Sequence, residues 1–281
     1  MRPFFMSIVS NSDHWMFISS TGGLSAGRKN SNYALFPYYT DDKITESSEH
    51  TGSKSIFLVH KGEKVFLWEP FSSRQEGVYE VSRNLYKNAY GNKVIFEEIN
   101  HDLEVSFSYE WNSSDAYGFL RHSTLKNNSD EPIEIRLLDG IQNILPYGVE
   151  SALQNSTSNL VDAYKKCELE VDTGLGIYSL SAIIVDKAEP SEALKANVVW
   201  SLGLNSSKKL ISSTQVEDFR RGIQINEEID IKFLLEKFSS NKKENNSIHF
   251  FETITSSSRI TPYLFSLKNQ EIPLIGAFLQ P

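Results

Sequence analysis

The sequence predicts an all-β protein with minor helices, and three observations lead to that class. Strand-like segments recur along most of the 281 residues. The clearest, residues 103–111, alternates apolar and polar side chains, the pattern of a half-buried antiparallel strand. Turn-forming Asn, Asp, Gly and Ser residues separate the segments. A chain of this length can form one large β domain with a sizeable core.

A meander is the best-defined part of the prediction. Four consecutive strands are expected at residues 93–99, 103–111, 117–126 and 133–138. The turn residues at 100–102 separate the first two segments, and those at 127–130 separate the last two. Within the second strand, Trp111 lies on the apolar face and is expected in the core.

Strands are also expected on both sides of this meander. Residues 55–60 and 64–68 flank Lys61-Gly62-Glu63 and predict a hairpin. Further strands are expected at residues 77–86, 176–185 and 196–204, and another begins at Trp15. Short helices are predicted within residues 149–169 and at 190–195 with Ser191 as N-cap, whereas 229–238 fits a helix or a strand.

Composition excludes several classes of function. A net charge of -8 and a pI near 5.4 provide no basic surface for nucleic acid. Cys167 is the only cysteine, so an intrachain disulfide and a cysteine-based metal cluster are excluded. The six histidines show no metal-ligand spacing, and neither a cofactor nor a metal is expected. With no secretory segment and no apolar window of membrane-spanning length, we expect a cytoplasmic protein.

Residues 22–29 come close to a phosphate-binding loop but fail on chemistry. Arg28 stands where that motif requires lysine, and Asn30 follows Lys29 where a hydroxyl should bind magnesium. A Pro-containing aromatic segment then replaces the helix that would receive phosphate. Gly22 is better explained by the positive φ of a tight turn.

A candidate sugar site lies in residues 15–42, where aromatic rings, an arginine and carboxylates gather. Rings stack on the C–H faces of a sugar, and polar groups bond to its hydroxyls. The expected substrate-binding residues are Arg28, Tyr38, Tyr39, Asp41 and Trp68.

The alternatives to this site are structural. The aromatic rings of residues 36–42 can pack inward from a proline-fixed turn, and composition favours that reading. Trp68, at a strand end, can be an exposed platform, a core residue or an interdomain contact. Adjacent Asp41 and Asp42 would point apart in a strand, so no catalytic acid pair is expected. His101 and His122 could serve a sugar epimerase as acid and base, although a structural role is favoured.

The order of these pieces resembles the N-terminal β-supersandwich of cellobiose phosphorylase-like proteins, glycoside hydrolase family 94. The similarity covers roughly the first two hundred residues. Its segments are 18–23, 68–70, 118–127, 133–137, 163–168 and 173–178, beginning with Ile-Ser-Ser-Thr-Gly-Gly and Trp-Glu-Pro. Residues 25–33 depart from the more aromatic and basic segment of characterised members, so the substrate does not carry over.

The resemblance implies a large antiparallel two-sheet supersandwich similar to the galactose mutarotase-like fold. Residues 1–281 would form that single domain as the N-terminal part of a longer protein, with 239–281 a linker or irregular C-terminal segment. In such proteins a following (α/α)6 barrel carries the catalytic acid, and inorganic phosphate is a co-substrate if the enzyme is a phosphorylase. This chain has no run of long helices that would form the barrel.

We therefore expect a domain that shapes the sugar cleft and dimer interface of a carbohydrate phosphorylase or glycosidase. Its partners would be an oligosaccharide or β-glucoside, the C-terminal barrel of the same protein and a second copy in a homodimer. Neither a membrane nor a nucleic acid is expected as a partner, and the chain alone is expected to lack catalytic activity. The alternatives are a stand-alone carbohydrate-binding module and a mutarotase-like epimerase.

Overall fold

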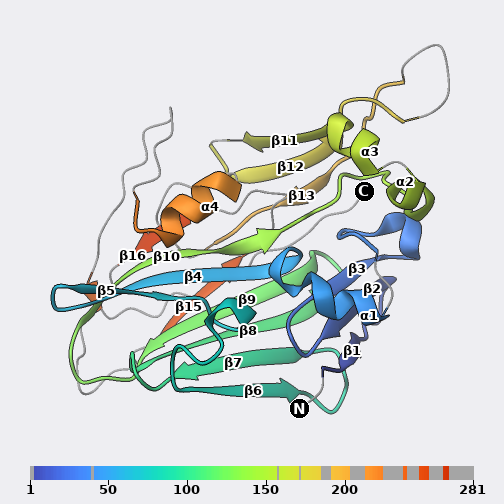
Figure 1. Ribbon diagram of the computed structural model, residues 1–281. Coiled ribbons are helices and arrows are strands. Elements are labelled where there is room, and N and C mark those ends of the chain that lie inside the picture. Colours follow the sequence, from blue (N-terminus) through green and yellow to red (C-terminus); the bar gives the residue numbers. More distant parts are fainter. Residues whose placement is uncertain are drawn as a thin grey trace.

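A computed structural model describes residues 3–38, 41–156, 158–170, 172–184, 191–202, 213–223, 237–238, 247–252 and 262–265. Its strands form four antiparallel sheets, and its helices are few and short. The predicted all-β class with minor helices is therefore confirmed. Two of the sheets have five strands each and lie one above the other (Figure 1).

The first large sheet is built on the predicted hairpin, which is confirmed as β4 and β5. β10 pairs with β4 from Glu134 opposite His60 to Gln142 opposite Gly52. The far edge of β10 pairs with two short strands from later in the chain. The strands are β4 (Gly52–Lys61), β5 (Lys64–Trp68), β10 (Ile133–Gln142), β14 (Lys237–Phe238) and β16 (Pro262–Phe265).

The second large sheet contains three strands of the predicted meander in the order β15-β9-β8-β7-β6. Its members are β6 (Val81–Lys87), β7 (Val94–Asn100), β8 (Val105–Ser114), β9 (Gly118–Asn127) and β15 (Ser247–Glu252). β15 and β16 lie in the segment 239–281, for which the sequence indicated no regular structure.

The fourth strand of the expected meander leaves this sheet, which corrects the prediction. β10 joins the opposite sheet because it carries apolar side chains on both faces. Ile135 and Leu137 belong to the core between the sheets, whereas Leu138 belongs to a separate cluster on the outer face. A strand with two apolar faces is stable only where both are covered.

The core lies between the two large sheets. Alternate residues of β8 point into it, as predicted, and Val105, Phe107 and Trp111 are fully buried there. The Phe107 ring meets the Phe57 ring of β4 at a centroid distance of 5.1 Å. This contact joins the inner faces of the two sheets, as in a β-sandwich.

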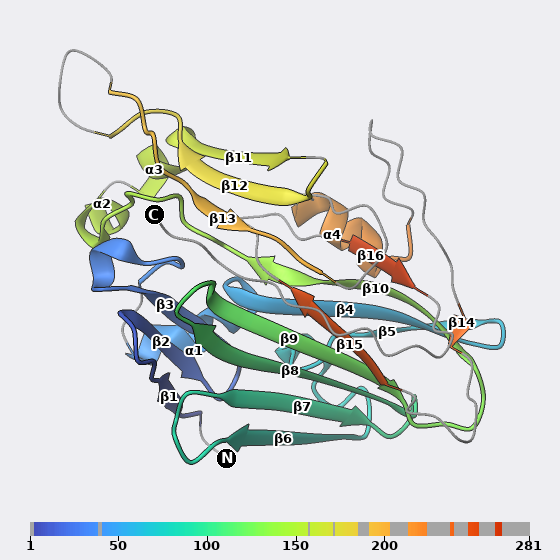
Figure 2. The same ribbon diagram turned by 180° about the vertical axis from the view of Figure 1, so that it is seen from behind.

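Two three-stranded sheets flank the sandwich (Figure 2). Gly22 has φ +92° in the turn between β2 and β3, as the glycine-turn explanation requires. A Cβ on the neighbouring Gly23 would lie 2.1 Å from the carbonyl oxygen of Ile44. The six strands are β1 (Phe5–Ile8), β2 (His14–Ser19), β3 (Leu24–Arg28), β11 (Lys165–Glu170), β12 (Leu175–Leu180) and β13 (Asn197–Val199).

Helical segments connect and cover the sheets. The short helices expected within 149–169 are confirmed, whereas a helix at 190–195 is wrong for the described residues, because Ser191 forms an extended bridge with Ile183. Of residues 229–238, only 237–238 are described. The helices are α1 (Asp41–Glu46), α2 (Ser151–Ser156), α3 (Ser158–Tyr164) and α4 (Ser213–Arg220), with 3-10 turns η1 (Ser31–Tyr33), η2 (Ser47–Glu49) and η3 (Ser73–Gln75). None of the described helices combines the length and apolar character that crossing a bilayer requires.

Candidate functional site

A group of aromatic rings lies on the face of the β1-β2-β3 sheet that points away from the main core, where half-buried Trp15 packs against a smaller apolar cluster around Leu145 and Val149. Trp15 and Phe17 of β2 share that face, because the alternate residues Met16 and Ile18 point into the core. The Trp15 ring contacts Phe17 at 5.8 Å and Tyr38 at 5.9 Å between centroids. Tyr38 remains 39% exposed and meets Trp15 edge-on, with 78° between the ring planes. We call Trp15, Phe17 and Tyr38 the ring surface.

Local backbone contacts fix this ring surface. After β3 the chain folds back so that Ala34 bridges Gly27, and a Cβ on Gly27 would lie 2.8 Å from Cζ2 of Trp15. Only glycine leaves room for this approach. The backbone N–H of Tyr38 donates to Oε1 of Gln154 in α2 at 3.0 Å. The exposed ring is therefore anchored by its main chain.

Arg28 is not part of the ring surface. It pairs in register with His14, whereas Trp15 pairs with Gly27, so Arg28 and Trp15 lie on opposite faces of the hairpin. The Arg28 guanidinium donates from Nε to Oδ1 of Asp13 at 2.8 Å. This hydrogen bond lowers the pKa of Asp13. The structure thus separates Arg28 from Tyr38.

The expectation that Trp68 offers an exposed ring is wrong. Trp68 is 1% exposed and packs on Phe57 at 5.1 Å between ring centroids. Its indole N–H donates to Oε1 of Glu98 at 2.8 Å, and Glu98 is itself buried. The carboxylate satisfies the indole donor inside the core, so Trp68 is a core residue.

The side chains of the last two predicted residues, Tyr39 and Asp41, are not among those that the structure describes. Tyr39 falls outside the described residues. Asp41 begins α1, and its side chain also lies outside the described part of the structure. The backbone at Asp41 and Asp42 is helical, so the expectation of a strand there is corrected.

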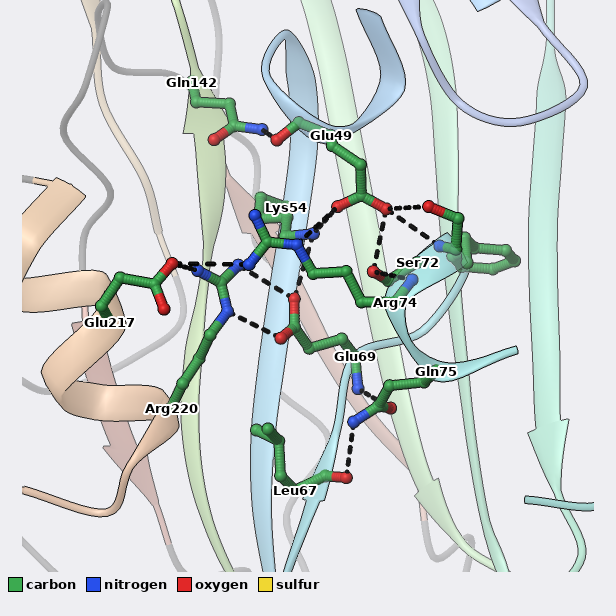
Figure 3. A network of polar contacts seen from close by, with 12 residues as sticks. Glu49, Lys54, Leu67, Glu69, Ser72, Arg74, Gln75, Gln142, Glu217 and Arg220 are labelled. Carbon is green, nitrogen blue, oxygen red and sulfur yellow. Dashed lines mark hydrogen bonds and ion pairs between the residues drawn. The ribbon is translucent and has the colours of Figure 1, made fainter. Parts of the chain in front are cut away.

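A polar network that the sequence did not predict lies beneath α4 (Figure 3). Arg220 donates from Nε to Oε1 of Glu69 at 2.7 Å and from Nη2 to Oε2 at 3.0 Å. Lys54 lies between Glu69 and Glu49, with Nζ 3.1 Å and 2.5 Å from their carboxylate oxygens. Glu69 and Arg220 are 151 residues apart in sequence, so no local pattern indicates their contact.

The carboxylates of this network are held in their ionised form. Burial alone would raise the pKa of Glu49, but the Lys54 ammonium and hydrogen bonds from Lys54, Ser72 and Ser73 lower it to about 2. Burial would likewise raise the pKa of Glu69, but the hydrogen bonds and positive charges of Arg220 and Lys54 outweigh that effect and lower it. Groups held so firmly as anions are poor proton donors at neutral pH.

A small pocket adjoins the network. Glu49, Lys54, Ser72, Gly22 and Tyr109 are among its lining residues. The space open to the centres of water molecules is ≈ 20 Å³, and one water needs about 10–15 Å³ on that measure. The pocket therefore has room for one or two waters and is too small for a sugar ring.

An ion pair crosses the interior of the sandwich near this pocket. Arg121 of β9 donates to both carboxylate oxygens of Asp139 in β10, each at 2.9 Å, and both residues are 0% exposed. The guanidinium lies over the Tyr109 ring, 5.1 Å from its centroid. Ser55 donates to the same carboxylate. The pair thus ties the two large sheets together.

The histidines considered for proton transfer are far apart. His122 pairs in register with Glu110 on β8, whereas His101 lies in the turn before Val105 begins that strand. Val105 and Glu110 are five positions apart along β8, which corresponds to roughly 16 Å. Within the described ranges, no three His, Cys, Asp or Glu residues are arranged to hold a metal ion.

Comparison with known proteins adds no relative. No protein-family model matches the chain, and a search of curated proteins finds no significant match. The resemblance to family 94 therefore stays a prediction. Any functional inference has to come from the arrangement of the side chains.

Proposed function

We propose that this chain is a carbohydrate-associated β-sandwich domain that binds a saccharide at the ring surface. One observation carries the proposal: the exposed Tyr38 ring is held edge-on against Trp15. The Tyr38 ring is exposed and the Trp15 ring beside it is half-buried, so the two rings offer an apolar contact at the surface. Sugars present C–H faces that stack on such rings, while their hydroxyls stay in water.

The electrostatics favour binding over catalysis. The half-buried carboxylate of Glu49 and the buried carboxylate of Glu69 are paired with cations, and the adjacent pocket has room for only one or two waters. A glycosidase needs two carboxyl groups flanking a sugar-sized cleft, one of them a proton donor. The described residues do not combine these features. The chain would contribute to recognition, while chemistry would belong to another domain.

The finer proposal follows the family resemblance. The chain would be a supersandwich of the galactose mutarotase-like type that shapes the sugar cleft and dimer interface for an (α/α)6 barrel. Two packed five-stranded antiparallel sheets agree with that architecture. Inorganic phosphate would then be a co-substrate of the whole enzyme if it is a phosphorylase.

A stand-alone carbohydrate-binding module is the second candidate. It is favoured by the composition of the ring surface, whose three rings all belong to this chain. The separation of His101 from His122 gives no comparable support to an epimerase.

Titration calorimetry with a panel of oligosaccharides tests the proposal. Wild type should bind at least one member saturably, and Tyr38→Ala should weaken that binding about fivefold, because a lost ring contact costs about 1 kcal/mol. Tyr90→Ala is the matched control, since Tyr90 is 86% exposed on the turn between β6 and β7. Absence of binding across the panel, or equal binding by wild type and Tyr38→Ala, would overturn the proposal.

A further inference from the structure

We infer that the saccharide bound at the ring surface is anionic, carrying carboxylate or sulfate groups. The inference rests on the proposed function and names its ligand class. It comes from a second group of side chains beside the ring surface, Lys29, Tyr33, Tyr147 and Lys195, which we call the cationic end. None of these residues was singled out as a ligand contact from the sequence.

The cationic end is assembled from three distant parts of the chain. The rings of Tyr33 and Tyr147 lie 6.4 Å apart between centroids. The Lys29 ammonium lies 5.3 Å from the centre of the Tyr33 ring, and the Lys195 ammonium lies 5.2 Å from that of Tyr147. Each ammonium is thus drawn to an aromatic face. Two positive charges flank a pair of phenol rings.

Both ammonium groups are available to a ligand. Lys29 and Lys195 are exposed, and among the described residues neither has a carboxylate within 4.0 Å. The nearby acid Asp13 is bound by Arg28. Glu150 is close in sequence to Tyr147 and Glu192 to Lys195, and both acids are exposed, yet among the described residues neither makes an ion pair with Lys29 or Lys195.

This lack of carboxylate partners contrasts with three lysines elsewhere in the chain. Lys54, Lys61 and Lys93 each have a carboxylate oxygen within hydrogen-bond distance. In a protein with a net charge of -8, Lys29 and Lys195 provide two ammonium groups that no ion pair among the described residues neutralises. An anionic ligand would complement these charges, whereas a neutral ligand would gain nothing from them.

The backbone at Lys29 adds a separate observation. Lys29 has φ +54°, a left-handed conformation that disfavours side chains larger than glycine. Its N–H donates to the carbonyl of Asp13 at 2.7 Å, which holds it in that conformation. A glycine at this position would adopt the same positive φ without that steric cost. The lysine side chain is therefore kept although the backbone conformation disfavours it. Such outliers occur preferentially at functional sites.

The cationic end shares a chain segment with the ring surface. Tyr33 and Tyr38 belong to the segment that includes η1, and this segment lies beside α2 in both views (Figures 1 and 2). The contact is held by Asn32, whose Oδ1 accepts from the backbone N–H of Ser151 at 3.2 Å. A saccharide that stacks on Tyr38 and runs along this segment would approach Lys29, which belongs to the same segment. An ammonium is a compact charge with three donors, suited to a carboxylate or sulfate.

Matched pairs of oligosaccharides test this inference with the protein as it is. Wild type is titrated with a neutral oligosaccharide, its uronic-acid counterpart and its sulfated counterpart, at low and high salt. The acidic members should bind about tenfold more tightly than the neutral one, and salt should remove most of that difference. Comparing the uronic and sulfated members identifies the preferred anion.

Charge-removing variants assign the effect to the cationic end. Lys29→Met and Lys195→Met should each weaken binding of the acidic member several-fold and leave the neutral member unchanged. Lys64→Met, at the exposed β4-β5 turn, is the matched control and should change neither. Lys29→Gly should lose the same acidic preference without lowering the melting temperature, because it relieves the positive φ.

Distinct results separate this inference from the proposed function. Equal binding of neutral and acidic members, or lysine variants indistinguishable from wild type, would refute the anionic preference. If Tyr38→Ala still weakened binding in that case, the carbohydrate function would stand. Binding of inorganic sulfate as tight as that of the sulfated oligosaccharide would refute the saccharide part. Failure of wild type to bind any of these ligands would refute both.

Discussion

Arg121 and Asp139 form a bidentate ion pair in the fully buried space between the two large sheets, with both N–O distances at 2.9 Å. Arg121 belongs to β9 of one sheet and Asp139 to β10 of the other. After β9 ends at Asn127, the chain crosses to the other sheet to form β10. The ion pair therefore links two consecutive strands that lie in different sheets. Burying two charges is costly unless each compensates the other.

Removing one partner of this pair should be far more damaging than removing both. Arg121→Met leaves the Asp139 carboxylate buried without its cation, and we expect a loss of about 3–5 kcal/mol in the free energy of unfolding. The double variant Arg121→Met/Asp139→Leu should recover much of that loss. Urea denaturation followed by circular dichroism measures both. Lys61→Met, in the exposed pair with Glu104, is the control and should cost under about 1 kcal/mol. A mild Arg121 single variant would contradict the expectation.

Arg220 should hold α4 on the outer face of the β4-β5 sheet. Arg220→Ala removes a bidentate partner from Glu69, which is 2% exposed, while Val216 and Phe219 keep their apolar contacts. We expect faster amide hydrogen exchange in residues 213–220 and a loss of about 2–4 kcal/mol in stability. The neighbouring exposed Arg221→Ala is the matched control. Equal exchange in the two variants would show that the ion pair does not secure the helix.

Acid should weaken the fold through Glu49. Its pKa falls from 4.5 to about 2 on folding, so the unfolded chain binds more protons between these values. The stabilisation is complete above about pH 4.5 and declines as the pH falls toward 2. Its size is up to about 3 kcal/mol, reduced by the partial exposure of Glu49.

Glu49→Gln isolates that contribution. The variant should be less stable than wild type at pH 7 and should lose less stability on acidification between pH 5 and 3. Denaturant unfolding at a series of pH values measures the slope. Glu63→Gln, in the exposed β4-β5 turn, should keep the wild-type profile. Parallel profiles for wild type and Glu49→Gln would disprove the role assigned to Glu49.

Gly23 should tolerate no side chain. Gly23→Ala places a Cβ 2.1 Å from the Ile44 carbonyl oxygen, so the backbone of α1 or of the turn must move. We expect a loss of more than about 3 kcal/mol, in the range of severe overpacking. Gly62→Ala is the control, because nothing lies within 4 Å of its added Cβ and only the positive φ opposes it, at about 1 kcal/mol. Melting temperatures rank the two variants, and a reversed ranking would exclude a steric role for Gly23.

The local part of the fold was predictable because it depends on neighbouring residues. The alternation in 103–111 and the turn at Lys61-Gly62-Glu63 identify β8 and the β4-β5 hairpin from a few positions. The transfer of β10 to the other sheet was not predictable. It depends on α4 covering Leu138, and α4 lies far along the chain.

The candidate site shows the same division. Tyr38 was predicted from its surroundings in the sequence, and it is exposed beside Trp15. The prediction for Trp68 was wrong because Glu69 and Pro70, which follow it at a strand end, suggest a surface position. The buried acceptor of its indole N–H is Glu98, which belongs to another strand. Lys195 contacts Tyr147 and Arg220 contacts Glu69, and in both pairs the partners are far apart in sequence. No local sequence pattern can predict such contacts.

The long-range docking of α4 also determines when the outer face is covered during synthesis. Glu69 and Arg220 are 151 residues apart, so a ribosome adding about 5–20 residues per second completes the second roughly 8–30 seconds after the first. During that interval Ile56, Leu58 and Leu138 have no α4 to cover them. The nascent chain would present an apolar sheet face to water and to chaperones until residue 220 emerges from the exit tunnel.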